Sequence, residues 1–374
     1  MDNLWRDEEA GGLAGLDLLI YRSRLIGREA NLVLWGGGNT SIKQTETDFR
    51  GREIRVMRIK GSGSDLESIE RIDFPGVRLD DLDPLRHRDE MSDEAMVAYL
   101  AHCLVDPGSG RPSIETLLHA FIPYPHIDHT HADAILVLTN TTDGKRHVEA
   151  CFEGQAIWIP YRRPGFRLSR EVAAAVEKNP GARCAVLEKH GLITWGATAR
   201  DSYDAMIEMN TRAEEYARRK ERDRAVFGST VRAPLDPEAR RRVAAAVAPH
   251  LRGLLSRADD GVVSRVVLRF NDGEDVLEFA GSEAGPQLCL GGPATPDHVL
   301  YTRPRPLFLH QGLPDRMEDD AGVETLKSAI TRGVEGYASW YDVYFRKNSD
   351  GTTVSLASRP RVVLLPGVGM FTAW

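Results

Sequence analysis

The sequence predicts an α/β fold with a larger N-terminal domain and a smaller C-terminal one. Short apolar runs rich in β-branched residues, which favour strands, alternate with amphipathic stretches at helical spacing. A chain of 374 residues can bury a substantial core and is long enough for two domains. The composition changes after the proline-containing segment 231–237, so we expect the domains to comprise residues 1–230 and 231–374.

The expected elements follow from apolar periodicity and from turn residues. In the N-terminal domain we expect helices at 13–30, 92–106, from 113 onward, 169–178 and 200–224. Strands are expected there at 32–35, 54–59, 127–138, 156–161 and 184–196, with a hairpin-like turn at 143–144. In the C-terminal domain we expect helices at 237–256 and about 321–346, and strands at 262–270, 274–280 and 361–365.

Composition excludes several classes of partner. The net charge is −7 and acidic and basic residues are interleaved, which gives no electrostatic case for binding nucleic acid or an anionic membrane. No apolar run approaches the length of a membrane span, and the acidic N-terminus lacks the apolar region of a signal peptide. The four cysteines are widely spaced, which suits reduced thiols. We therefore expect a cytoplasmic protein.

The pair His129 and His131 is the first candidate for chemistry. If residues 127–138 form a strand, both imidazoles project from the same face, because side chains alternate along a strand. Buried imidazoles need partners, and a divalent metal would satisfy both. A His-x-His pair commonly supplies two ligands of a three-histidine zinc site. Two polar histidines at the end of a strand remain the alternative from these residues alone.

Two glycine-rich turns are candidates for anion binding. Residues 36–42 read Gly-Gly-Gly-Asn-Thr-Ser-Ile, and residues 60–65 read Lys-Gly-Ser-Gly-Ser-Asp after a predicted strand. Such turns leave backbone amides accessible, although tight structural turns would have the same sequence. Two further histidines have structural interpretations: His119 is expected to bond or pack on its helix, and His298 to be a satisfied loop residue.

Six short motifs occur together in one order along the chain. They are Gly-Asn-Thr-Ser (38–41), Lys-Gly-Ser-Gly-Ser-Asp (60–65), Pro-Ser-Ile-Glu (112–115), His-Thr-His (129–131), Ile-Pro-Tyr (159–161) and Lys-His-Gly (189–191). In this combination the chain resembles the class II (zinc-dependent) aldolase/adducin-head family over about residues 13–225. The nearest resemblance is to the aldolase half of bifunctional rhamnulose-1-phosphate aldolase/short-chain dehydrogenase proteins. Residues 226–374 resemble the region between their two halves.

The resemblance implies an α/β/α domain around a central, mainly antiparallel sheet, and it assigns roles to individual residues. His129, His131 and His190 match the ligands of Zn2+ or another divalent metal, and Glu115 matches the acid/base. The positions that hold the substrate phosphate correspond to Gly38, Asn39, Gly61, Ser62 and Ser113. Tyr161 matches a tyrosine that acts across a subunit boundary, so the resemblance implies a homo-oligomer, with a tetramer favoured.

The activity implied by the resemblance is that of a metal-dependent aldolase. It would cleave a ketose 1-phosphate, similar to rhamnulose 1-phosphate, to dihydroxyacetone phosphate and an aldehyde through a zinc-stabilised enediolate. Ile114 departs from the family pattern, because relatives often have a second serine there. A sugar-phosphate 4-epimerase and a 3-oxo sugar-acid phosphate decarboxylase are alternatives within the family. A non-catalytic adducin-like interaction module is the alternative of another class.

Overall fold

The computed structural model describes residues 1–221, 226–259, 262–349, 355 and 358–374. Its chain divides into two compact units. Unit 1 contains Met1–Arg222 and the short segment Ala294–Asp297, and unit 2 contains Asp223–Pro293 and His298–Trp374. The chain therefore leaves unit 1 after its first 222 residues and returns to it for one short segment.

Unit 1 is built on a seven-stranded sheet with the order β3-β2-β1-β4-β7-β6-β5. The strands are β1 (Asn39–Thr47), β2 (Glu53–Ile59), β3 (Gly76–Arg78), β4 (His126–Thr130), β5 (Ala156–Ile159), β6 (Cys184–Leu187) and β7 (Gly191–Gly196). Neighbouring strands are antiparallel, apart from the parallel pair β5 and β6. The mainly antiparallel sheet expected from the sequence is confirmed, and it places β4 at its centre.

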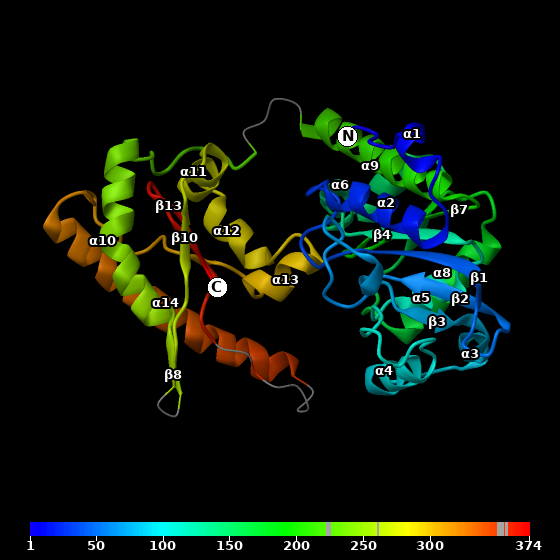
Figure 1. Ribbon diagram of the computed structural model, residues 1–374. Helices are drawn as coiled ribbons and strands as arrows, with labels where there is room; N and C mark the ends of the chain where they lie inside the picture. The colour runs from blue at the N-terminus through cyan, green and yellow to red at the C-terminus, as the bar shows by residue number, and fades with distance from the viewer. Residues whose placement is uncertain (222–225, 260–261, 350–354, 356–357) are drawn as a thin grey trace. The chain divides into compact units, whose positions relative to one another are not determined.

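Helices cover both faces of this sheet (Figure 1). The helices are α1 (Asp7–Ala10), α2 (Gly15–Gly27), α3 (Leu79–Leu82), α4 (Asp93–His102), α5 (Thr116–Phe121), α6 (Asp133–Thr139), α7 (Gly144–Phe152), α8 (Phe166–Lys178) and α9 (Ala199–Glu221), with 3-10 turns η1 (Arg71–Asp73) and η2 (Asp83–His87). Alternate strand residues face opposite ways: Leu192 joins the core formed with α2, α6, α7 and α9, whereas Ile193 joins the core formed with α5 and α8. Unit 1 is therefore a three-layer α/β/α structure.

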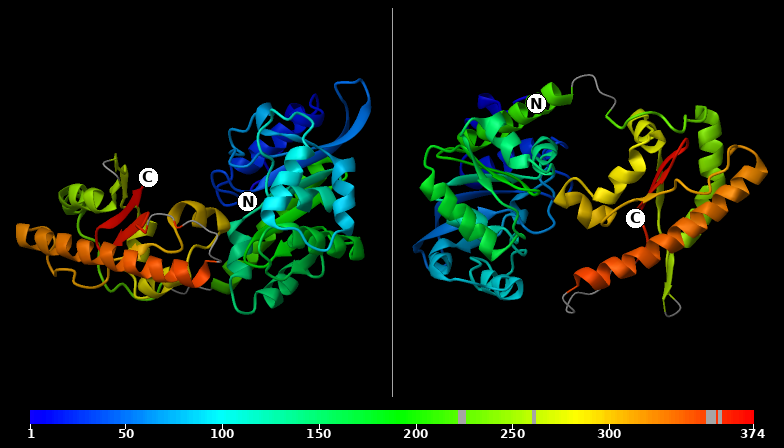
Figure 2. Two further views of the ribbon diagram at one scale, coloured as in Figure 1. Left: turned by 90° about the horizontal axis from the view of Figure 1, so that it is seen from below. Right: turned by 180° about the vertical axis from the view of Figure 1, so that it is seen from behind.

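Unit 2 is smaller and has its own sheet, with the order β10-β13-β12-β11. Its elements are α10 (Pro237–Leu255), β8 (Arg257–Asp259), β9 (Val262–Ser264), β10 (Leu268–Asn271), α11 (Glu274–Gly281), α12 (Gly285–Leu288), η3 (Cys289–Gly291), α13 (Pro296–Thr302), β11 (Leu307–Phe308), α14 (Asp320–Asn348), β12 (Val362–Leu365) and β13 (Gly369–Ala373). Apolar residues of α10 and α14 share one buried core with residues of β12 and β13. In Figure 2 the orange helix α14 runs beside the red strands. In the described part of the chain, no helix combines the length and the apolar character needed to cross a bilayer.

Several predicted elements are wrong in type. The run 127–138 is a strand only as far as Thr130, and its apolar second half forms helix α6. Residues 274–280 form helix α11 instead of a strand. The apolar part of the first run and the whole of the second are short, so periodicity alone could not distinguish a strand from a helix. Residues 32–35 form turns and no strand, with Leu32 and Val33 buried in the core.

The structure also differs from the prediction at two connections between elements. Residues 184–196 are two antiparallel strands, β6 and β7, joined by a tight turn that contains His190, and are not one strand. Asp143 and Gly144 do not form a hairpin, because Gly144 begins helix α7. A Cβ atom at Gly144 would lie 2.8 Å from the carbonyl oxygen of Leu138, so the close approach of α6 and α7 requires this glycine.

Candidate metal centre

Strand β4 supplies two of the candidate metal ligands. In the sheet register, His129 lies opposite Asn39 of β1 and Ile193 of β7, so it stands near the centre of the sheet. His131 follows immediately after the end of the strand. Asp128 faces the other side, where it is completely buried against Arg22 of α2, with 3.0 Å between Oδ1 and Nε. The alternation of the strand thus separates a structural ion pair from the candidate ligands.

The third histidine, His190, reaches the same place from the turn between β6 and β7. Lys189 precedes it with a left-handed backbone (φ +55°) and Gly191 follows it. A Cβ atom at Gly191 would lie 2.1 Å from the carbonyl oxygen of Thr130, so only glycine allows β7 to approach β4 this closely. This tight turn brings the His190 ring to His129.

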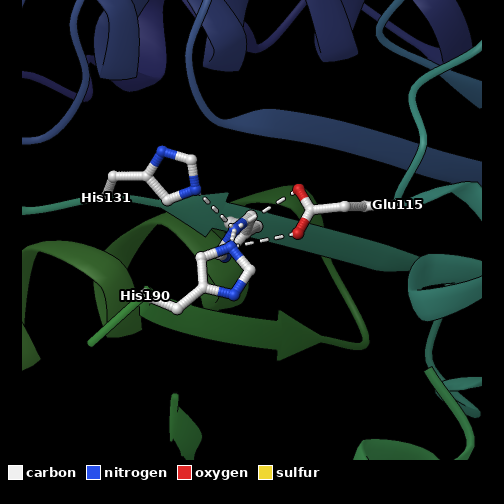
Figure 3. Close-up of side chains that lie close together, drawn as sticks. Glu115, His131 and His190 are labelled. Atoms are coloured by element: carbon white, nitrogen blue, oxygen red, sulfur yellow. Dashed lines mark hydrogen bonds and ion pairs between the residues drawn. The ribbon is translucent and has the colours of Figure 1, made fainter. Parts of the chain in front are cut away.

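The side chains of these three histidines and Glu115 meet at one point. Figure 3 shows Glu115, His131 and His190 pointing toward one another. The Nε2 atom of His129 lies 3.1 Å from Nε2 of His131 and 3.3 Å from Nε2 of His190. The two carboxylate oxygens of Glu115 lie 3.4 Å from Nε2 of His129 and 3.2 Å from Nε2 of His190. One ligand atom from each of the four residues lies within 4.8 Å of all the others.

Hydrogen bonds on the opposite side of the rings fix the protons of two histidines. Nδ1 of His129 is 2.9 Å from the carbonyl oxygen of Leu192, and Nδ1 of His131 is 2.6 Å from Oδ1 of Asp297. A carbonyl or carboxylate oxygen can only accept, so each Nδ1 carries the proton and each Nε2 presents a lone pair. Lone pairs that face one another at about 3 Å repel unless a cation lies between them. The donor set therefore fits a divalent metal ion, and zinc is the ion that nitrogen-rich sites favour.

Burial keeps the central histidine in the form that a metal ligand needs. The side chain of His129 is fully buried, and this burial lowers the pKa of His129 to about 3, against the opposing effect of the Glu115 carboxylate. The imidazole is therefore neutral at physiological pH, as coordination requires.

Glu115 is positioned by the loop that precedes α5. The helix begins at Thr116, so Glu115 stands just before its first turn and not within it. The Ser113 hydroxyl accepts a hydrogen bond from the Glu115 amide at 3.2 Å, and Nδ2 of Asn39 donates to the Glu115 carboxylate at 2.7 Å. Nδ2 of Asn39 is also 3.3 Å from the Ser113 hydroxyl. Two of the residues expected to hold a phosphate thus lie directly beside the candidate metal centre.

The other expected phosphate positions lie in two neighbouring loops. Gly61 pairs with Pro112 in an isolated bridge, so the loop at 60–62 runs beside the loop that carries Ser113. The Gly61 and Ser62 amides donate to the carbonyl oxygens of Asp73 and Arg111, at 2.7 and 2.8 Å, so the exposed Ser62 hydroxyl is the group that an anion could meet.

Gly38 and Tyr161 occupy contrasting surroundings. Gly38 immediately precedes β1 with φ +58°, and a Cβ atom there would lie 2.8 Å from the carbonyl oxygen of His129. Tyr161 follows β5, and its side chain is 52% exposed. Its amide donates to the Glu188 carboxylate at 2.9 Å. Gly38 therefore lies beside the backbone of His129 at the candidate centre, whereas Tyr161 lies on the surface of unit 1.

Sequence reasoning missed two charged residues at this site. Lys60 is buried, its ammonium donates to the carbonyl oxygen of Gly36 at 2.8 Å, and burial lowers its pKa to about 8 although Asp297 and Glu115 oppose the shift. Burial acts to raise the pKa of Asp297, but the interactions with His131 and the hydrogen bond from the Leu34 amide together outweigh burial and hold that pKa below its ordinary value. Lys60 directly precedes Gly61, a predicted anion-binding residue, and this neighbourhood could have identified Lys60 as a charged residue of the site.

Comparisons with known proteins agree with this arrangement. A family model described as Class II Aldolase and Adducin N-terminal domain matches residues 17–217, and one described as Aldolase class II, second domain, matches residues 242–373. A curated relative from Bacillus subtilis (strain 168), described as the uncharacterized oxidoreductase YuxG, is 43% identical over 369 residues, which are 98% of this chain and 52% of the relative. This chain thus spans about half the length of that relative.

One solved structure is similar in both sequence and fold. It is the N-terminal class II aldolase domain of a conserved protein from Thermoplasma acidophilum, which is 44% identical to this chain. The likeness covers 58% of this chain and 99% of that one, with a TM-score of 0.55.

Proposed function

Because this chain belongs to the class II aldolase and adducin family, we propose that it is a metal-dependent aldolase acting on a ketose 1-phosphate. The observation that carries the proposal is the convergence of three imidazole nitrogens and the Glu115 carboxylate on one point. In a protein that only binds partners, nothing would stabilise imidazole nitrogens whose lone pairs face one another in a buried site. Residues that serve only packing would not be arranged in this way.

The residues suit a cleavage of the C3–C4 bond. In that reaction the C4 hydroxyl loses its proton as the aldehyde forms, and the electron pair of the broken bond remains on the C2–C3 unit. A bound divalent ion would act as a Lewis acid on the negative charge that develops there. The proton released at C4 passes to a base or to solvent, and the Glu115 carboxylate, which stands next to the metal ligands, takes up a proton and delivers it to C3. One proton is thus lost at C4 and one is gained at C3.

The substrate is proposed to carry a phosphate at C1, as in rhamnulose 1-phosphate. Asn39 and Ser113 supply an amide and a hydroxyl beside Glu115, and the Ser62 hydroxyl extends from the neighbouring loop. The Lys60 ammonium is close enough to Asp297 and Glu115 to interact with both carboxylates. These groups offer hydrogen bonds and one positive charge to an anion. The exposed Ile114 adds no hydroxyl to this set.

An NMR screen of ketose 1-phosphates tests the proposal. The zinc-loaded chain should release dihydroxyacetone phosphate and an aldehyde from one of them, and a chelator should abolish the reaction. The variant His129→Ala serves as a matched control, because it removes one ligand while leaving the substrate loops intact. Inversion at C4 without release of aldehyde would instead identify an epimerase, and release of carbon dioxide from a 3-oxo sugar-acid phosphate would identify a decarboxylase. A chain that binds no metal would contradict every enzymatic alternative and favour an adducin-like module.

A further inference from the structure

The segment Ala294–Asp297 is anchored in unit 1 by hydrogen bonds at both of its ends. The Asp297 carboxylate accepts through both oxygens: Oδ1 from Nδ1 of His131 at 2.6 Å and Oδ2 from the amide of Leu34 at 3.2 Å. At the other end, Nδ2 of Asn140 donates to the carbonyl oxygen of Ala294 at 2.9 Å. Asp297 is 2% exposed. A carboxylate this buried is held in place by its partners.

The glycine turn at 36–38 is shaped around this carboxylate. A Cβ atom at Gly37 would lie 2.2 Å from Oδ2 of Asp297, so any other residue would collide with it. The turn therefore has a structural role besides the predicted anion binding, since Gly37 makes room for an aspartate that is distant in the chain.

We propose that Asp297 is a positioning residue that acts on metal binding through His131. This inference rests on the proposed metal site. The carboxylate fixes the proton on Nδ1 and the rotation of the ring, so that the Nε2 lone pair faces the other ligands. It also increases the electron density of the imidazole, as a carboxylate does more strongly than a neutral carbonyl.

The three histidines differ in this support. Nδ1 of His129 donates to a backbone carbonyl, and Nδ1 of His190 has no hydrogen-bond partner among the described residues. Among the described residues, His131 alone of the three has its Nδ1 bonded to a carboxylate, because Glu115 meets His129 and His190 at Nε2. The Asp297 carboxylate lies within the part of the chain that matches the second-domain model, residues 242–373. The carboxylate that bonds His131 thus comes from a residue outside the segment 17–217 that matches the N-terminal domain model.

The experiment measures zinc affinity in the full chain, by competition with a chromophoric chelator at fixed pH. Outer carboxylates of this kind typically contribute 10–100-fold to metal affinity, so we expect Asp297→Ala to weaken zinc binding by about that factor. Asp297→Asn, which keeps an acceptor but loses the charge, should have a smaller effect. Asp80→Asn is the matched control, because it removes a carboxylate from an exposed ion pair with Arg55 and should leave the affinity unchanged.

A second background separates positioning from a general structural effect. In a chain that already carries His131→Ala, Asp297→Ala should weaken zinc binding no further, because the residue through which it acts is gone. An equal loss in both backgrounds, or no loss in either, would overturn the inference. A wild-type chain that binds zinc but cleaves no sugar phosphate would contradict the proposed activity and leave this inference standing. A wild-type chain that binds no zinc would overturn the site itself.

Discussion

We propose that Glu115 serves both the candidate metal centre and the reaction. It is buried, it lies beside two of the three histidines, and it is held by Asn39 on its outer side. Its carboxylate is therefore fixed in orientation before any substrate arrives. Such fixed placement is what general acid/base catalysis requires.

Changing Glu115→Gln should separate these two duties. Glutamine keeps the size and the hydrogen-bonding capacity of the side chain but cannot carry a proton between atoms. Because three imidazole ligands remain, zinc content should stay close to that of the wild type, whereas turnover should fall by about 10²–10⁴-fold. Metal analysis alongside steady-state kinetics checks both expectations. Turnover equal to that of the wild type would remove Glu115 from the chemistry.

At the same scale, the sequence indicated the candidate ligands but not the carboxylate that bonds His131. His129 and His131 could be found because a strand alternates its side chains, and Glu115 and His190 were assigned through the family motifs. Asp297 could not be found in this way, because it lies 166 residues from His131 and only tertiary folding brings them together. Its neighbour His298 attracted attention instead, since a histidine is the commoner sign of a metal site.

At the scale of elements, a buried ion pair ties together the layers of unit 1. Arg22 of α2 pairs with Asp128 of β4, and it also donates to the carbonyl oxygen of Ser41 in β1 at 2.8 Å. Ser202 of α9 donates to the other oxygen of Asp128 at 2.7 Å. Two helices and two strands are thereby joined on the face of β4 opposite to the histidines.

Removing one partner of this pair should be strongly destabilising. Arg22→Met leaves the Asp128 carboxylate buried without its counter-charge, which typically costs about 3–5 kcal/mol. The double variant Arg22→Met, Asp128→Asn should regain much of that loss. Urea unfolding in the presence of EDTA measures both without a contribution from metal. Arg200→Met is the control, because it breaks an exposed pair with Asp7 that solvent screens, and its effect on stability should be small. Equal losses for Arg22→Met and Arg200→Met would contradict the structural role.

Element types were predictable where periodicity was long and failed where it was short. The long helices α9 and α14 were identified from their repeating apolar positions. The helix α6 was missed because its apolar residues include β-branched ones, although their burial at Ile135, Leu136, Leu138 and Thr139 follows helical spacing. The turn at Glu188–His190 was missed because Lys189, and not a glycine or asparagine, adopts the left-handed backbone.

At the scale of the whole molecule, the position of Tyr161 bears on assembly. It follows β5, which is separated from β4 by β6 and β7 in the sheet. Three strand spacings amount to roughly 14 Å between β5 and β4, whereas the Tyr161 amide bonds the Glu188 carboxylate in the turn that carries His190. The family resemblance implies that the tyrosine acts across a subunit boundary, and we propose on this basis that the exposed Tyr161 serves the site of a neighbouring subunit. Such a head-to-tail contact has to close into a ring to avoid an open filament.

Mixing two inactive variants tests this shared-site arrangement. Chains carrying Tyr161→Phe and chains carrying Glu115→Gln should each be impaired, but a mixed oligomer can combine an intact Glu115 from one chain with an intact Tyr161 from the next. We therefore expect activity to return after the two are unfolded and refolded together. Each variant refolded alone serves as the control. Mixed oligomers that stay inactive would show that Tyr161 has no part in a neighbour's site.

The return of the chain to unit 1 at Ala294–Asp297 also sets an order of events during synthesis. A ribosome adds about 5–20 residues per second, so the 166 residues between His131 and Asp297 take on the order of 10–30 s to make. In the later part of that interval, once His190 has also been made, all three histidines are present but His131 still lacks its carboxylate. We therefore expect a nascent chain to bind metal weakly at first. Its metal affinity should rise only after residue 297 has been synthesised and the Asp297 carboxylate has bonded to His131.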